Sequence, residues 1–369
     1  ARSGGLTDRL GVDPQVLALA LARMTESVGN SFLIVVLPLY IGSGRLAGTT
    51  FGLPEVAFTG VVLSLFGFVN SSLQPLTGRA SDRTGRRKVF VLVGLVVTAT
   101  ASFAYSLSTN YWQLLVLRVG QGVAGALVIP TTVALVNDLA TQDNRGGNMG
   151  TYNTFTLVGF GVGPVAAGAL VAAGPYTLDL GPLALKLSGF DAAFYVATLT
   201  AATSFVLVSW LIEDPEVEAA AADQPRSAVA VFDRSGEHLL DPVFTLGAVS
   251  FFMAVGIALF ATLGDIVNPR LDQGPTMFGL QFAAFVLAQV ALQAPIGRAT
   301  DFYGRKPFVV IGTLLLVPTT LAQGFILDSW LMFLARFGQG VAGAMVFAPA
   351  MALAGDLAPD GQSGRPCRC

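Results

Sequence analysis

A short charged segment occurs twice in the chain, and each copy lies between two long apolar runs. Residues 78–87 read GRASDRTGRR, and residues 297–306, which lie 219 positions later, read GRATDFYGRK. A second segment, RVGQGVAGA at residues 118–126, recurs as RFGQGVAGA at residues 336–344. Repeats at a nearly constant offset indicate two related halves. In membrane transporters built this way, the substrate site usually lies between the halves near the bilayer midplane.

Ten apolar runs are long enough to cross the hydrocarbon core of a bilayer, which takes about 20 helical residues. They cover residues 15–41, 56–77, 88–108, 111–136, 149–173, 191–212, 243–264, 276–296, 307–326 and 329–355. Because lipid satisfies no backbone polar group, each run is expected to be a helix. The sequence therefore predicts an all-α multi-pass membrane protein with two pseudo-symmetric bundles. The first has six spans (1–212), a cytoplasmic linker follows (213–242), and the second has four of an expected six spans and a tail (243–369).

The composition gives no sign of catalysis, metal binding or nucleic-acid binding. Cys367 and Cys369 are the only cysteines, and His238 is the only histidine. They form neither a disulfide framework nor a metal-ligand spacing, and no nucleophile–base set is present. The net charge of −2 gives no reason to expect nucleic acid as a partner. We expect neither an enzyme nor a bound cofactor or metal.

The distribution of Lys and Arg predicts the orientation in the membrane. They concentrate at the N-terminus, in residues 78–87, 137–148, 213–242 and 297–306, and in the tail, whereas the opposite loops hold only Arg45, Lys186 and Arg270. Cytoplasmic loops carry an excess of basic residues. Both termini and the linker are thus expected in the cytoplasm, with the protein in the plasma membrane.

Three motifs resemble those of the major facilitator superfamily, and the match covers nearly the whole chain. The repeated loop is similar to the family's signature between its second and third helices, through Gly78, Asp82, Arg83, Gly85, Arg86 and Arg87, and again through Gly297, Asp301, Gly304 and Arg305. The fourth-helix motif is matched by Arg118, Gln121 and Gly122, with the second copy at Arg336, Gln339 and Gly340. The fifth span resembles the motif of the drug-and-proton antiporter branch through Gly150, Gly159, Gly163, Pro164 and Gly168. The resemblance implies twelve helices in two bundles, alternating access and secondary transport; the ten runs fall two short of that number.

The repeated loop is predicted to act as a cytoplasmic gate. Gly78 permits close helix approach and Gly85 a tight turn, and the Asp82 carboxylate can bond an arginine or the positive end of a facing helix. The alternative is that the basic residues only set topology. Topology does not require a fixed Gly and Asp, and both recur in the second copy. In span five, Gly159 and Gly163 form a small-residue face and Pro164 allows a bend, either for packing alone or to prevent leak.

Four charged residues lie within the spans: Arg23, Glu26, Arg118 and Arg336. Each costs on the order of 3 kcal/mol in lipid by insertion scales, so each should face the bundle interior and find a partner. Arg23 and Glu26 share a helix face because they are three residues apart. Glu26 is either a static partner of Arg23 or a carboxylate that exchanges a proton during transport, with Arg23 and Arg118 tuning it.

The favoured function is a proton-coupled exporter of small organic or drug-like molecules, acting as a monomer in the bilayer. One alternative is a nutrient or metabolite symporter or uniporter. Another is a truncated, transport-inactive membrane protein, suggested by the shortfall of two spans and the Pro-Cys-Arg-Cys ending.

Overall fold

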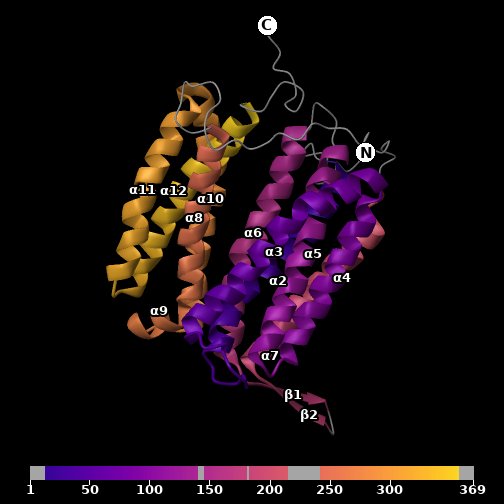
Figure 1. Ribbon diagram of the computed structural model, residues 1–369, viewed down its shortest axis with the longest axis vertical. Coiled ribbons are helices and arrows are strands. Elements are labelled where there is room, and N and C mark those ends of the chain that lie inside the picture. Colours follow the sequence, from indigo (N-terminus) through magenta and orange to yellow (C-terminus); the bar gives the residue numbers. More distant parts are fainter. Residues whose placement is uncertain (1–12, 140–144, 181–182, 215–241, 357–369) are drawn as a thin grey trace, which may run out of the picture. The chain divides into compact units, whose positions relative to one another are not determined.

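The computed structural model describes residues 13–139, 145–180, 183–214 and 242–356 (Figure 1). Its secondary structure consists of α2 (Pro14–Ile41), α3 (Glu55–Thr84), α4 (Arg87–Ser106), α5 (Tyr111–Leu139), α6 (Arg145–Ala173), β1 (Tyr176–Leu180), β2 (Leu183–Leu187), α7 (Gly189–Leu211), α8 (Pro242–Thr262), α9 (Gly264–Arg270), α10 (Pro275–Tyr303), α11 (Arg305–Phe325) and α12 (Ser329–Asp356). Every predicted span coincides with one long helix. Within the described residues, eight helices are long and apolar enough to cross a membrane.

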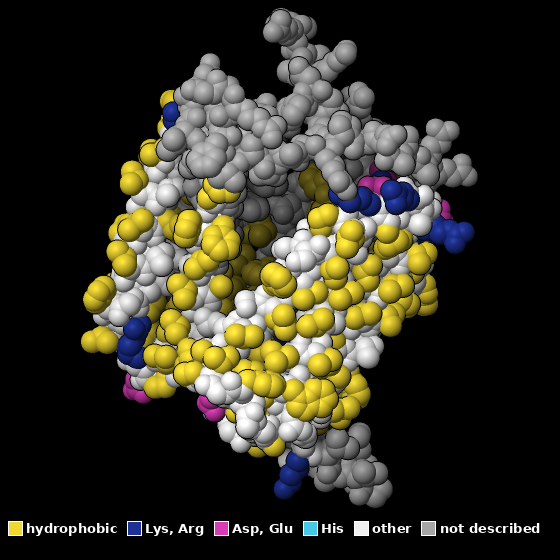
Figure 2. All heavy atoms as spheres, in the orientation of Figure 1, with side chains coloured by type: hydrophobic (Ala, Val, Ile, Leu, Met, Phe, Trp, Pro, Cys, Tyr) yellow, Lys and Arg dark blue, Asp and Glu magenta, His cyan; other side chains and the backbone are white. Residues whose placement is uncertain are grey.

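The outer surface of these helices is mostly hydrophobic along their flanks. Figure 2 shows hydrophobic side chains covering the described helices, whereas Lys and Arg side chains lie near the helix ends. Exposed apolar side chains include Phe103 on α4, Leu199 on α7 and Leu314 on α11. A soluble protein does not expose such continuous apolar surface, so lipid is the solvent of these flanks and the protein is a multi-pass membrane protein.

The chain divides into two compact units. The first comprises Ala1–Ala222 and Phe260–Ala283, and the second comprises Asp223–Leu259 and Ala284–Cys369. The helix α9 and the first part of α10 therefore pack with the first unit. The predicted domain boundaries at residues 212 and 242 follow the sequence repeat, and they stay a prediction.

In the first unit, α2 packs against α6 and α7, α5 packs against α3 and α4, and α4 also contacts α7. Buried apolar residues of α2, α4, α5 and α7 form its core, among them Leu19, Leu95, Leu135 and Val208. In the second unit, α11 packs along α12.

Polar residues fix the helix ends. Asp13 caps α2 by accepting a hydrogen bond from the Gln15 N–H at 2.8 Å, and Pro14 occupies the first turn, where its missing N–H has no cost. Ser188 and Asp191 form a capping box at the start of α7, and each satisfies an otherwise free backbone donor. Asp214, just past α7, accepts a hydrogen bond from the Lys88 N–H at 2.7 Å, which ties this segment to the first turn of α4.

The repeated segment predicted as a loop is mostly helical. The helix α3 continues to Thr84, and α4 begins at Arg87, so only Gly85 and Arg86 lie between them. Gly304 alone separates α10 from α11. The prediction ended each helix where its apolar run ended, but polar residues continue a helix outside the hydrocarbon core because the backbone hydrogen bonds remain within the helix. Gly85 and Gly304 have φ of +64° and +83°, a conformation that side chains disfavour.

A β-hairpin that the sequence analysis did not predict follows α6. The strands β1 and β2 pair antiparallel with Tyr176 opposite Leu187 and Thr177 opposite Lys186, and the hairpin lies at the end of α7 in Figure 1. Each strand has five residues, which is short for detecting a period of two within a predicted loop between spans.

Candidate functional site

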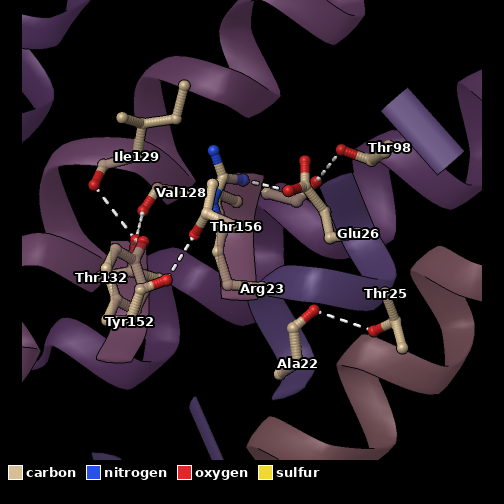
Figure 3. A network of polar contacts seen from close by, with 11 residues as sticks. Ala22, Arg23, Thr25, Glu26, Thr98, Val128, Ile129, Thr132, Tyr152 and Thr156 are labelled. Atoms are coloured by element: carbon tan, nitrogen blue, oxygen red, sulfur yellow. Dashed lines mark hydrogen bonds and ion pairs between the residues drawn. The ribbon is translucent and has the colours of Figure 1, made fainter. Parts of the chain in front are cut away.

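A buried ion pair lies on α2 (Figure 3). Arg23 Nη1 contacts Glu26 Oε2, and their side chains are 11% and 5% exposed. The two residues are one helical turn apart, so the local geometry of α2 brings them together. A charge in such a place is tolerated because it has its counter-charge at contact distance.

Hydroxyl groups from neighbouring helices surround this pair. Tyr152 of α6 lies beside Arg23, and Thr98 of α4 lies beside Glu26 (Figure 3). The Tyr152 hydroxyl oxygen is 2.6 Å from Thr132 Oγ1 on α5, and both are buried. A small cavity borders the pair, with walls of mainly apolar residues from α2, α4, α5 and α7, including Leu19, Val91 and Val208. The pair thus lies in the interior of the first unit, where groups that can donate or accept a proton are close to it.

Arg118 on α5 has a different environment from Arg23. Its Nη1 donates to Gln121 Oε1 at 2.9 Å, and the same oxygen accepts from the Tyr105 hydroxyl at 3.1 Å. The guanidinium lies 5.3 Å from the centre of the Phe66 ring, a cation–π distance. Its hydrogen-bond partner is thus a neutral side chain rather than Glu26, and the tuning of Glu26 by Arg118 stays a prediction.

The second unit contains an equivalent cluster at Arg336. Its Nη1 donates to Gln339 Oε1, and its guanidinium lies 5.1 Å from the centre of the Phe285 ring. Gln323 donates to the same Gln339 oxygen at 3.1 Å, so it takes the place that Tyr105 has in the first unit. Gln339 in turn donates to Thr320 Oγ1 at 3.0 Å. The repeat thus preserves the Arg–Gln–Phe arrangement, although the third partner differs.

The glycine of each Arg–Gln motif allows its helix to approach a neighbour closely. A Cβ built on Gly122 would lie 2.7 Å from Val69 Cβ, and one built on Gly340 would lie 2.8 Å from Ala288 Cβ. Both distances are shorter than real contacts. The α3–α5 pair and the α10–α12 pair are therefore packed at equivalent points, which brings Phe66 and Phe285 over the arginines.

Arg87 joins two carboxylates at the repeated loop of the first unit. Its Nε is 2.8 Å from Asp138 Oδ2 on α5, and its Nη2 is 3.4 Å from Asp82 Oδ1 on α3. Arg83 and Arg86 are exposed. The sequence analysis assigned no role to Asp138. In the second copy the side chain of Asp301 lies outside the described residues, and Arg305 is half-buried.

Gly78 and Gly297, the first residues of the two loop motifs, have no neighbour within 4 Å of a built Cβ among the described residues. The close helix approach expected at Gly78 therefore stays a prediction.

The glycines of α6 pack against two different helices. Built Cβ atoms would collide with α2 at Met24 for Gly159, and at Val28 and Ser31 for Gly163. On another face, Gly168 meets Pro275, and Pro164 meets Gly279 of α10. Gly150 has nothing within 4 Å in the described structure. The antiporter-type segment therefore lies between α2 and the first part of α10, with Gly150 outside both contacts.

Comparison with known proteins identifies the family. The sequence pattern of the Major Facilitator Superfamily matches residues 19–268 and 244–366. The chain is 25% identical over 321 residues to the multi-drug resistance efflux pump PmrA homolog of Lactococcus lactis subsp. lactis (strain IL1403). The matched region covers 85% of this chain and 74% of that protein. It is 22% identical over 328 residues to the quinolone resistance protein NorA of Staphylococcus aureus (strain COL), and this matched region covers 88% of this chain and 77% of NorA.

Solved structures share the fold. A bacterial homolog of the human lysosomal transporter Spinster, in an inward-facing and occupied conformation, superposes with a TM-score of 0.70 at 14% identity, covering 93% of this chain and 74% of that one. The human organic anion transporter MFSD10 (TETRAN) superposes with a TM-score of 0.64 at 21% identity, covering 93% and 86%. Because the family pattern covers most of the described helices and the fold agrees with it, this chain belongs to the Major Facilitator Superfamily of membrane transporters.

Proposed function

We propose that this protein exports small organic molecules by alternating access and that protons moving inward drive the export. The observation that carries this proposal is the buried Glu26, paired with Arg23 and surrounded by hydroxyl groups. The relatives named as efflux and resistance proteins support the substrate class.

In this proposal, Glu26 alternates between an ionised and a protonated form during the transport cycle. When Glu26 is ionised, it neutralises Arg23. When Glu26 takes up a proton, Arg23 loses its counter-charge, and the neighbouring Tyr152 oxygen, which can accept a hydrogen bond, lies beside it. Proton uptake and release at Glu26 is the alternation that a proton-driven exporter requires.

The test compares two variants with the same chemical change. Glu26→Gln keeps an acceptor for Arg23 but cannot carry a proton, whereas Glu55→Gln changes an exposed carboxylate at the start of α3. In proteoliposomes with an imposed pH gradient, we expect Glu26→Gln to lose uphill transport of a fluorescent quinolone and to retain downhill exchange. Glu55→Gln should transport as the unaltered protein does.

Three outcomes would contradict parts of this proposal. Normal uphill transport by Glu26→Gln would make Glu26 a static partner of Arg23. Transport driven by a sodium gradient and not by a pH gradient would favour the symporter alternative. A protein that binds the quinolone and moves none under any gradient would favour the transport-inactive alternative.

We further propose that the protein acts as a monomer in the plasma membrane, with both termini in the cytoplasm. The basic residues support this orientation, because Arg45, Lys186 and Arg270 alone lie in the loops assigned to the outside. Single cysteines at Ser43, Lys186 and Gln273 should react with an impermeant maleimide in intact cells. A cysteine at Ser227, which lies outside the described residues, should react only after permeabilisation, and its labelling in intact cells would reverse the assignment.

A further inference from the structure

An apolar groove lies where the β-hairpin meets the ends of α6 and α7. It has a volume of about 690 Å³ and is lined by Leu170 of α6, Pro175, Tyr176, Thr177, Leu187 and, on α7, Ala192, Tyr195 and Val196. This volume falls within the roughly 300–1,000 Å³ typical of small-molecule sites. The groove lies within the first unit, and the gate, the Arg–Gln clusters and the Glu26 site do not use any of its residues.

The position of the groove places it at the boundary of the membrane. Leu170 lies in the last turns of the span Gly147–Ala173, and Ala192 and Tyr195 lie in the first turns of the span Gly189–Leu211. Two tyrosines, Tyr176 and Tyr195, line it. Tyrosine is enriched at the membrane–water interface because its ring is apolar and its hydroxyl is polar.

The groove continues into the lipid-facing surface of the protein. Tyr195 is 36% exposed, and its ring stacks on that of Phe103 of α4 at 6.0 Å between centroids. One turn further along α7, Leu199 is 65% exposed. A hydrocarbon chain in the groove could therefore pass directly into the surrounding lipid without crossing a polar barrier.

The hairpin supplies walls and a basic residue to the groove. Tyr176 pairs with Leu187 across the two strands, and both line the groove. Thr177, which also lines it, pairs with Lys186, and Lys186 is exposed. The Asp191 carboxylate nearby is engaged with Ser188 in the capping box. An isolated two-stranded hairpin is marginally stable in water, so a ligand that contacts both the hairpin and α7 would stabilise it.

We propose that the groove holds one acyl chain of a phospholipid from the adjacent membrane leaflet, with Lys186 contacting its phosphate. The apolar walls would accept the chain and the tyrosines would lie at the interface. Lys186 is the register partner of the lining residue Thr177 and is exposed, so it is available to a headgroup beside the groove. Such a lipid would cover the groove and hold the hairpin against the end of α7. The leaflet is the outer one if the proposed orientation holds, but lipid binding in the groove does not depend on that orientation or on transport.

The experiment uses proteoliposomes of phosphatidylcholine that contain a trace of phosphatidylcholine with a diazirine on its acyl chain. After illumination, labelled peptides are identified by mass spectrometry. Labelling of residues 170–196 is compared with that of α11, where Leu314, Val317 and Leu321 are exposed and serve as the reference for contact with bulk lipid. We expect labelling of residues 170–196 to exceed the α11 reference about tenfold, the ratio that a site stronger than bulk lipid by about 1.4 kcal/mol would give.

Two variants on α7 separate groove binding from general lipid contact. Ala192→Trp fills the groove and should abolish the excess labelling, while Ala202→Trp, at a similarly half-buried position outside the groove, should leave it unchanged. Lys186→Gln should reduce the excess for the phosphatidylcholine probe and leave it unchanged for a diazirine diacylglycerol, which lacks a phosphate. Equal labelling of the groove and α11, or an excess that persists in Ala192→Trp, would overturn the proposal. Each result is independent of export, so failure here leaves the proposed function untouched.

Discussion

Arg118 and Arg336, 218 residues apart in the chain, each donate a hydrogen bond from Nη1 to the side-chain oxygen of the glutamine three residues later. Each also lies over a phenylalanine ring of a neighbouring helix. In both halves, therefore, a buried guanidinium donates to a neutral glutamine oxygen and lies against an aromatic ring. Because this glutamine oxygen accepts from a buried charge, its removal should be costly.

We predict that Gln121→Leu destabilises the first unit by about 2 kcal/mol, because it leaves the Arg118 charge and the Tyr105 hydroxyl without that acceptor. Adding Arg118→Leu to this variant should recover part of the loss, since an apolar pair of similar size avoids an unpartnered buried charge. The measurement is the midpoint of thermal unfolding of the purified protein in detergent. A double variant less stable than Gln121→Leu would show that Arg118 stabilises the unit without the glutamine.

At the repeated loop, we predict that Asp82→Asn slows transport more than Arg45→Gln does, at equal abundance in the membrane. Asp82 belongs to a repeated motif beside Arg87, whereas Arg45 lies in an unrepeated loop. We also expect Asp138→Asn to destabilise this loop more than Asp82→Asn, because the Arg87–Asp138 distance is shorter, at 2.8 Å, and Asp138 is less exposed. Transport assays and protease protection of the loop check the two statements. Equal transport by Asp82→Asn and Arg45→Gln would leave the loop with a topological role only.

Replacement of two glycines of α6 by alanine should change the stability of the protein in opposite directions. Gly163→Ala would place a methyl group against the Val28 carbonyl oxygen, 2.6 Å from the built Cβ, and backbone cannot yield as a side chain can. We expect a loss of about 1–3 kcal/mol, the usual cost of overpacking. A Cβ built on Gly150 has no atom of the described residues within 4 Å, so Gly150→Ala should stabilise α6 by up to about 1 kcal/mol through helix propensity. Thermal unfolding of both variants is the measurement, and equal shifts would contradict the packing of α6 on α2.

Asp265 on α9 should make stability depend on pH. Burial, and to a lesser degree the nearby Glu55 charge, raise the pKa of Asp265 from 3.8 to about 6. Its carboxylate lies against Gly42, where α2 ends, so the ionised form also faces the negative end of a helix. The folded protein therefore binds this proton more tightly than the unfolded chain does, and stability falls as pH rises from about 4 through about 6.

We accordingly expect Asp265→Asn to raise the unfolding midpoint at pH 7.5 and to flatten its dependence between pH 5 and pH 7, values chosen to bracket the raised pKa. Asp272→Asn is the matched control, because Asp272 is exposed and lies seven positions along the chain with φ of +48°, which asparagine tolerates. A lower midpoint for Asp265→Asn at pH 7.5 would mean that the ionised carboxylate stabilises the fold.

The sequence predicted the spans because length and apolarity alone decide whether a helix can cross a bilayer. It also predicted that Arg23 and Glu26 share one face of their helix, because helix geometry fixes which residues three positions apart are neighbours. Contacts between helices depend on how each helix is rotated, which a single apolar run does not encode. The Arg87–Asp138 pair was missed for that reason, although Asp138 and Asp356 recur at the offset of the repeat. Gln323 lies 218 residues after Tyr105, at the offset of the repeat, but the two side chains differ in chemistry, so the similarity between the halves gave no sign of their shared role.

The pairing of β1 with β2 restricts how the length of this loop can change during evolution. Side chains alternate between the two faces of a strand, so the insertion of one residue between Tyr176 and Thr177 would bring both side chains to the same face. The insertion of two residues would keep them on opposite faces. Among proteins that retain this hairpin, strand lengths should therefore differ by even numbers, and an odd change should coincide with a bulge.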